Sequence, residues 1–346
     1  MKFQQRDIRA AADAGIFSAA QATAFEAWLL ARYEHVVAFR PAHILYYLGG
    51  LIAIGAVSMF ITLAWERWAG APMLILALGF AALGVALTHW FLRRGFTVPA
   101  GIMITLAVAT TPLAVYSLQH LLGFWEAGHN RSVTDFHRYI DWRWFFMEMA
   151  TLITASIALW RYRMPFLMLP VGVVLWYLSM DLVPFFFQDL DHTWELRKLT
   201  TLYMGIVTTG LAFWVDVRSA RAKDYAFWLY LFGVLMFWCG LSTMHSDSEL
   251  NKFIYCLINL GMIAIGGLLM RRVFAVFGAL GVAGYLFHLA DLFSGSLLFP
   301  VLLAAMGIGI VFAGLFWQRN EARIHSALLD LLPVPVRRLV EHAHGS

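Results

Sequence analysis

Long apolar stretches, separated by short polar turns, follow one another along most of the chain. A helix needs about 20 mostly apolar residues to cross a bilayer, and a helix satisfies its own backbone groups there. The pattern therefore predicts an all-α, polytopic transmembrane helix bundle of about 10 spans. The expected spans lie near residues 43–65, 72–92, 97–122, 144–160, 164–187, 199–215, 225–243, 252–270, 273–293 and 296–317.

The two ends of the chain show a different, amphipathic pattern. Two short helices are expected near 4–13 and 19–33, with Gly15 between them and a capping-box spacing at Ser18 and Gln21. A third amphipathic segment follows the last span and carries basic residues, which is typical of a helix lying on a membrane surface. We therefore expect three parts, namely a cytosolic amphipathic helical hairpin at 1–40, a ten-helix transmembrane bundle at 41–318 and an interfacial C-terminal tail at 319–346.

Composition and charge support a membrane location and an orientation. The chain is 61% hydrophobic and 13% charged, whereas a soluble domain carries about 25% charged residues. If the N-terminus is cytosolic, 18 of the 25 Lys and Arg residues fall in the inner turns and tails. Because cytoplasmic loops are enriched in Lys and Arg, both termini are expected in the cytoplasm. The net charge of +4 is explained by these turns, so no nucleic-acid partner is expected.

Ionisable residues inside the apolar segments are the candidate functional groups. Such groups are costly in a bilayer and usually face a cavity or a partner. The predicted orientation places five of them in the outer half of the membrane, where they could form an outward-facing polar pocket that binds a cation or relays protons. These candidates are His120, Glu148, Asp181, His288 and Asp291. The alternative is structural: side chains near the interface can reach water, or can pair with Arg143 or Lys252.

Prolines and glycines indicate how the helices are shaped. Pro112, with Thr110 and Thr111 before it, is expected to interrupt the third span. Pro170 and Pro184 flank Asp181, so the fifth span is the best candidate for an irregular, functional helix. In the ninth span Gly278, Gly281 and Gly284 recur every three residues, which predicts a face for close helix packing.

No sequence motif predicts an enzyme, a cofactor site or a metal site. The nucleotide-binding glycine loops, the HExxH zinc motif and the GxSxG nucleophile motif are all missing from the sequence. The pair His288 and Asp291 is one helical turn apart, but a metal site needs three or four ligands. Cys239 and Cys256 lie in apolar segments, where thiols usually serve as packing groups. No catalytic, cofactor-binding or metal-binding residue is therefore assigned.

The N-terminal quarter resembles a known family. Residues 7–29 (DIRAAADAGIFSAAQATAFEAWL) and 44–70 (ILYYLGGLIAIGAVSMFITLAWERWAG) are similar to the uncharacterised bacterial membrane proteins of domain of unknown function 2157 (DUF2157). The resemblance covers about the first 70 residues. It implies a multi-pass protein of the bacterial cytoplasmic (inner) membrane with an N-terminal helical domain. It implies no activity and no site residues.

Three classes of function remain open on the sequence. The first is transport of a small solute or an ion, or an accessory role in such transport, through the outer polar pocket. The second is a non-transporting sensor or scaffold that binds an unknown protein partner through residues 1–40. The third is a membrane-embedded enzyme acting on a lipid-linked substrate. In each case the lipid bilayer is the expected surrounding partner.

Overall fold

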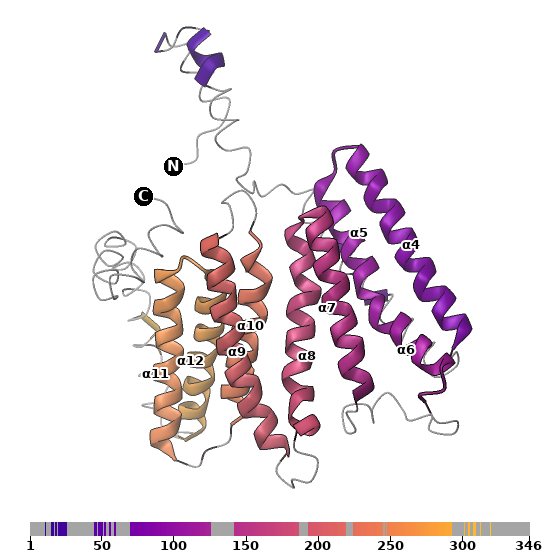
Figure 1. Cartoon of the computed structure of the whole chain (residues 1–346). Helices are drawn as coiled ribbons and strands as arrows, with labels where there is room; N and C mark the ends of the chain where they lie inside the picture. Colours follow the sequence, from indigo (N-terminus) through magenta and orange to yellow (C-terminus); the bar gives the residue numbers. More distant parts are fainter. Residues whose placement is uncertain are drawn as a thin grey trace.

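The computed structural model describes residues 70–125, 142–186, 193–218, 224–244 and 248–292, with isolated positions elsewhere. The expected first and last spans, both termini, the N-terminal hairpin and the C-terminal tail lie outside these continuous ranges. Within them the secondary structure is helical and contains no strand, which confirms the all-α class for this part of the chain (Figure 1).

The helices follow one another with short turns. They are α4 (Ala71–Arg93), α5 (Thr97–Ala109), α6 (Thr111–Leu121), α7 (Trp142–Tyr162), the 3₁₀ turn η2 (Pro165–Leu167), α8 (Met168–Phe186), α9 (Thr193–Arg218), α10 (Ala226–Ser242), α11 (Glu249–Leu268) and α12 (Arg272–Leu292). Successive helices from α4 to α10 pack side by side, as do α11 and α12, and α10 also contacts α8 and α12. Figure 1 shows α11 and α12 at one side of the bundle, α4 and α6 at the other, and α7 and α8 between them.

Six segments in the described ranges are long and apolar enough to cross a membrane. They are α4, α5 together with α6, η2 with most of α8, α9, α11 and α12. The helix α10 is apolar but has only 17 residues, and α7 is less apolar because it carries Arg143, Glu148 and Arg161. These helices are those of a multi-pass membrane protein. The full count of about ten spans stays a prediction.

The exposed surface of the helices is apolar, as contact with lipid requires. Large side chains such as Ile75, Ile153 and Phe287 are 71%, 60% and 76% exposed. In water such a surface would be unusual, because soluble proteins rarely expose large contiguous apolar patches. The exposure therefore supports the bilayer as the solvent of this bundle.

The third span is broken where proline was expected to break it. The helix α5 ends at Ala109 and α6 begins at Thr111, with Pro112 in the first turn of α6. Proline has no N–H to donate to the preceding turn, and its ring crowds the carbonyl four residues back. The hydroxyl of Thr110 donates to the carbonyl of Ala107 at 2.8 Å, which caps part of the interruption.

The fifth span, by contrast, is regular around Asp181. A continuous helix, α8, runs from Met168 to Phe186, so the expectation of an irregular helix at this position is wrong. Pro170 lies in the first turn of α8, where a helix has no partner for the missing N–H, and Pro184 lies close to its end. Neither proline therefore opens the helix between them.

The glycines of α12 make close contact with α11. Gly278 and Gly281 are buried against Asn259, which is fully buried and donates its Nδ2 to the carbonyl of Tyr255 at 2.8 Å. Gly284 is exposed and has nothing near it. The predicted packing face is thus confirmed for the first two glycines and does not extend to the third.

This contact gives a first testable prediction. In Gly278→Ala the new Cβ would lie 2.6 Å from the backbone oxygen of Asn259, so the two helices must move apart. We expect the free energy of unfolding to fall by about 1–3 kcal/mol, the usual cost of overpacking. The measurement is thermal unfolding of the purified protein in detergent. Gly284→Ala is the matched control and should leave the midpoint unchanged or slightly raised; an equal loss in both variants would contradict the packing account.

Candidate functional site

Two carboxyl groups meet between α7 and α8, which pack against each other. Glu148 lies on the buried face of α7 with Met147 and Thr151, and Asp181 lies in the C-terminal third of α8. Glu148 is 7% exposed and Asp181 is 9% exposed. The side chains are close enough to interact directly, carboxyl to carboxyl. The structure thus brings together two of the five residues that the sequence placed in an outer pocket.

The Glu148 carboxyl has no donor among the residues that the structure describes. Both of its oxygens are buried, and neither receives a hydrogen bond from a described N–H or O–H group. Within the same part of the chain, Asp181 is the titratable group that acts on Glu148. Burying an ionised carboxylate without a partner costs several kcal/mol, and two adjacent carboxylates repel each other. The Glu148 carboxyl in this position therefore needs its charge compensated, by a proton or by another positive species.

The carboxyl pair lies at the level of the broken third span. On α6, Gln119 donates its Nε2 to the carbonyl of Arg143 on α7 at 3.1 Å, and this bond fixes the antiparallel register of the two helices. Glu148 lies five residues after Arg143 on α7, and Ala114 lies five residues before Gln119 on α6. Because the two helices are antiparallel, Glu148 is therefore level with Ala114, which is less than two turns from the interruption at Thr110. A helix end near an ion-binding group is a recurrent arrangement in membrane transport proteins.

The hydroxyl groups around the pair are already engaged by backbone. Thr151 donates to the carbonyl of Met147 at 2.7 Å, and Ser117 donates to the carbonyl of Leu113 at 2.8 Å. Both side chains are almost fully buried. These two hydroxyl groups are polar, but both donate to the backbone of their own helices and neither donates to Glu148.

The face of α8 that carries Ser179, opposite the face with Asp181, contacts α9 close to the buried Lys198. Ser179 lies 3.5 Å from the hydroxyl of Thr201, and one turn before Thr201 is Lys198, which is 7% exposed. The Lys198 ammonium group binds Glu195 at 2.7 Å. The span expected at 199–215 would leave Lys198 in the preceding turn, whereas α9 begins at Thr193 and includes it. The spacing of Glu195 and Lys198, three residues apart, was the signal for a longer helix.

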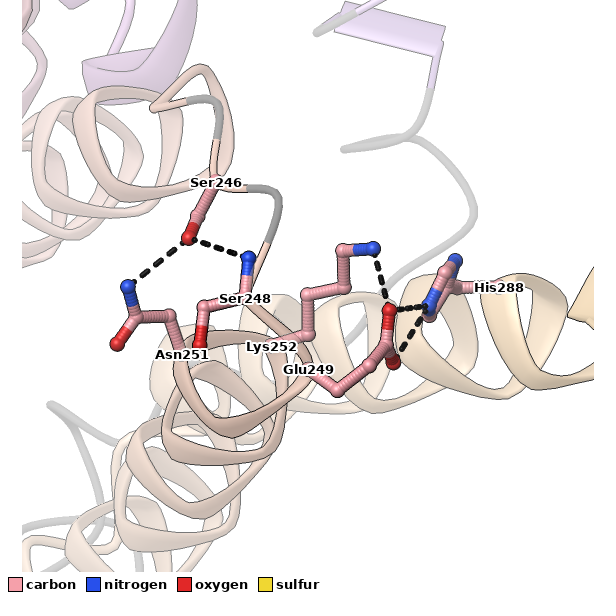
Figure 2. A network of polar contacts seen from close by, with 6 residues as sticks. All are labelled: Ser246, Ser248, Glu249, Asn251, Lys252 and His288. Carbon is pink, nitrogen blue, oxygen red and sulfur yellow. Dashed lines mark hydrogen bonds and ion pairs between the residues drawn. The ribbon is translucent and has the colours of Figure 1, made fainter.

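His288 pairs with a residue that the sequence analysis did not select. Its Nε2 lies 3.0 Å and 3.2 Å from the two carboxylate oxygens of Glu249, the first residue of α11. Figure 2 shows Lys252 reaching the same carboxylate, at 2.7 Å, from the other side. Asp291 is exposed, and within the described residues it has no hydrogen-bond or ion-pair partner. His288 and Asp291, which the sequence places one helical turn apart, are thus not joined by a described contact.

His120 contacts aromatic and backbone groups. Its ring packs edge-to-face against Tyr116 with 6.2 Å between centroids, and its Nδ1 lies near Gly70 at the start of α4. No described contact joins His120, His288 or Asp291 to the carboxyl pair. Moreover, α12 packs against α10 and α11, whereas α7 packs against α5, α6 and α8. A single pocket containing all five residues stays a prediction.

A second polar cluster, the Arg271 network, lies at the opposite end of the bundle. Arg271, in the turn between α11 and α12, binds both carboxylate oxygens of Asp216 on α9 and reaches Asp224 at 2.6 Å. Its guanidinium lies 5.3 Å from the ring centre of Tyr230, whose hydroxyl donates to Asp216 at 3.4 Å. Burial lowers the pKa of Arg271, but Asp224 and Asp216 more than offset this and leave that pKa above its ordinary value.

The Arg271 network was missed by sequence reasoning. Arg271 was read as one of many basic residues in the inner turns, and its partners come from parts of the chain that are 47 and 55 residues away. A cation that binds two carboxylates by a planar fork is well suited to hold helices together. The available signal was the presence of acidic residues, Asp216 and Asp224, in a region otherwise rich in Lys and Arg.

The described residues hold no group of three or more His, Cys, Asp or Glu side chains that could ligate a metal. Cys239 and Cys256 are free thiols.

Comparison with known proteins does not assign the chain to a family. No family model, no curated protein and no solved structure matches the chain.

Proposed function

We propose that this protein transports a small solute or an ion, or serves as the ion-binding subunit of a transporter, in the bacterial inner membrane. The observation that carries the proposal is the buried Glu148–Asp181 pair between α7 and α8, inside a bundle of apolar helices. Ionisable residues inside membrane segments usually mark ion or proton pathways, because their burial cost must be offset by a function or a partner.

The position of the pair supports an ion-binding role. The positive-inside distribution of Lys and Arg places the start of α7 and the end of α8 on the outer side. In that orientation the pair lies within about two helical turns of the outer surface, next to the interrupted third span. A cation entering from outside would therefore meet the two carboxyl groups before it reached the apolar inner half.

The alternatives have less support in the described residues. A membrane-embedded enzyme would need at least three reactive polar side chains close together, and the described contacts bring two of the five candidates together. A sensor or scaffold function rests on residues 1–40, which lie outside the continuously described ranges. Transport is therefore the function that the geometry supports best.

The test is ion flux in proteoliposomes, measured with fluorescent reporters for protons, Na⁺ and K⁺. Replacing Glu148 with glutamine or Asp181 with asparagine keeps the side-chain shape and removes the charge. We expect either change to reduce the flux at least about tenfold, the effect of losing roughly 1.4 kcal/mol of binding or barrier stabilisation.

Glu249→Gln is the matched control, since Glu249 is an exposed outer glutamate outside the pair. Its flux should stay near that of the wild type. Flux through the wild type that does not exceed that of empty liposomes, or flux that survives in Glu148→Gln, would reject the transport proposal.

A further inference from the structure

We propose that the Glu148–Asp181 pair holds a single proton, shared between the two carboxyl groups, and that H⁺ is the ion bound at this site. The inference rests on the proposed function for its biological meaning. Its experiment measures occupancy of the site and does not require transport.

The first argument is the hydrogen-bonding capacity of the two groups. An ionised carboxylate is acceptor-only, so two of them in contact can form no hydrogen bond. One added proton turns one group into a donor, and an O–H to carboxylate bond is short and strong. This bond also supplies the donor that the Glu148 oxygens do not find among the described residues.

The second argument is the number of ligands. Calcium takes six to eight oxygen ligands and magnesium needs six in near-octahedral geometry. The pair offers two carboxyl groups, and the neighbouring hydroxyl of Thr151 is turned to the backbone of its own helix. A proton needs two oxygens and fits this site without additional ligands.

The third argument is the charge around the pair. The titratable or charged groups nearest in sequence or on packed helices are Arg143 on α7, Tyr116 and His120 on α6, Tyr177 on α8, Glu195, Arg197 and Lys198 on α9, and Cys239 on α10; α5 carries none. Within the described residues, none of these acts on Glu148, whereas Asp181 does. Among the described groups, Asp181 is therefore the charged neighbour whose repulsion a proton on Glu148 relieves.

The experiment is labelling of the full-length protein in detergent with dicyclohexylcarbodiimide, an apolar reagent that reacts with protonated carboxyl groups. Peptide mass spectrometry locates and quantifies the label over a series of pH values. We expect the label on Glu148 or Asp181, increasing as the pH falls, and unchanged by added Na⁺, K⁺ or Ca²⁺. Removing the second acceptor, in Asp181→Asn, should lower labelling of Glu148 about tenfold at a fixed neutral pH, since neighbouring carboxyls strongly favour the shared proton.

Three other outcomes overturn the inference. Labelling that is blocked by Na⁺ or Ca²⁺ at constant pH would assign the site to that cation and leave the transport proposal intact. Labelling found only on carboxyl groups outside the pair, or on no residue at all, would show that the pair holds no proton. The cation competition uses the wild-type protein, so the result stands even if a variant fails to fold. Proton-dependent labelling combined with no flux in liposomes would reject the proposed function alone.

Discussion

Replacement of Gly205 with leucine is expected to prevent α9 and α10 from packing, which would be the largest effect of any single change considered for this bundle. A Cβ at Gly205 would lie 2.8 Å from the backbone oxygen of Gly233 and nearer still to the backbone nitrogen of Phe237. These are backbone atoms, so no rotamer change relieves the clash. Small residues at such contacts let membrane helices approach closely, and packing is the main force that joins them.

We expect Gly205→Leu to lower the free energy of unfolding by about 3 kcal/mol or more, which is the upper range for overpacking. The variant should elute from size-exclusion chromatography as aggregate or in low yield. Gly210→Leu is the matched control on the same helix, because Gly210 is exposed and has nothing within 4 Å. A monodisperse Gly205→Leu variant with the thermal midpoint of the wild type would contradict the close contact of α9 and α10.

Removal of the Arg271 side chain is expected to have the second-largest effect. Arg271→Ala leaves Asp216, whose side chain is 14% exposed, without its fork of two hydrogen bonds, and it also frees Asp224. Breaking a buried pair by deleting one partner typically costs about 3–5 kcal/mol, because a buried charge is left uncompensated. We expect Arg271→Ala to lower the free energy of unfolding by about 3 kcal/mol, the lower end of that range. The lower end applies because the Arg271 side chain is 22% exposed, so water partly solvates the group.

The comparison for Arg271 is its neighbour. Arg272 is exposed and has no ion-pair partner in the described part of the chain, so Arg272→Ala should have little effect on the unfolding midpoint. Arg271→Lys should be intermediate, because a lysine keeps the charge but not the planar fork. Equal stability of the two alanine variants would show that the network does not hold α9, α10 and the α11–α12 turn together.

Hydropathy located the membrane helices well because lipid imposes one simple demand on them. The expected span 72–92 corresponds to α4 (Ala71–Arg93), and 273–293 corresponds to α12 (Arg272–Leu292). The largest difference is at 199–215, since α9 begins at Thr193 and carries Glu195 and Lys198 in its early turns. Paired charges extend a helix beyond its apolar part, and a hydropathy pattern does not register them.

The break at Pro112 followed from local chemistry, whereas the partners of the polar residues did not. The sequence predicts a common membrane depth for Glu148 and Asp181, and in the structure these two side chains interact. Which helices are neighbours cannot be read in this way. Consequently Glu249 on α11, the partner of His288, was not among the residues that the sequence selected.

In the arrangement described above, α7 and α8 bring Glu148 and Asp181 together, separately from His288. The most direct measurement is thiol cross-linking in native membranes with a short bis-maleimide, in a background where Cys239 and Cys256 are replaced by alanine. The account predicts efficient cross-linking of Glu148→Cys with Asp181→Cys, and none of Glu148→Cys with His288→Cys, seen by peptide mass spectrometry. Failure of the first pair would contradict the carboxyl pair, and efficient reaction of the second would contradict its separation from His288.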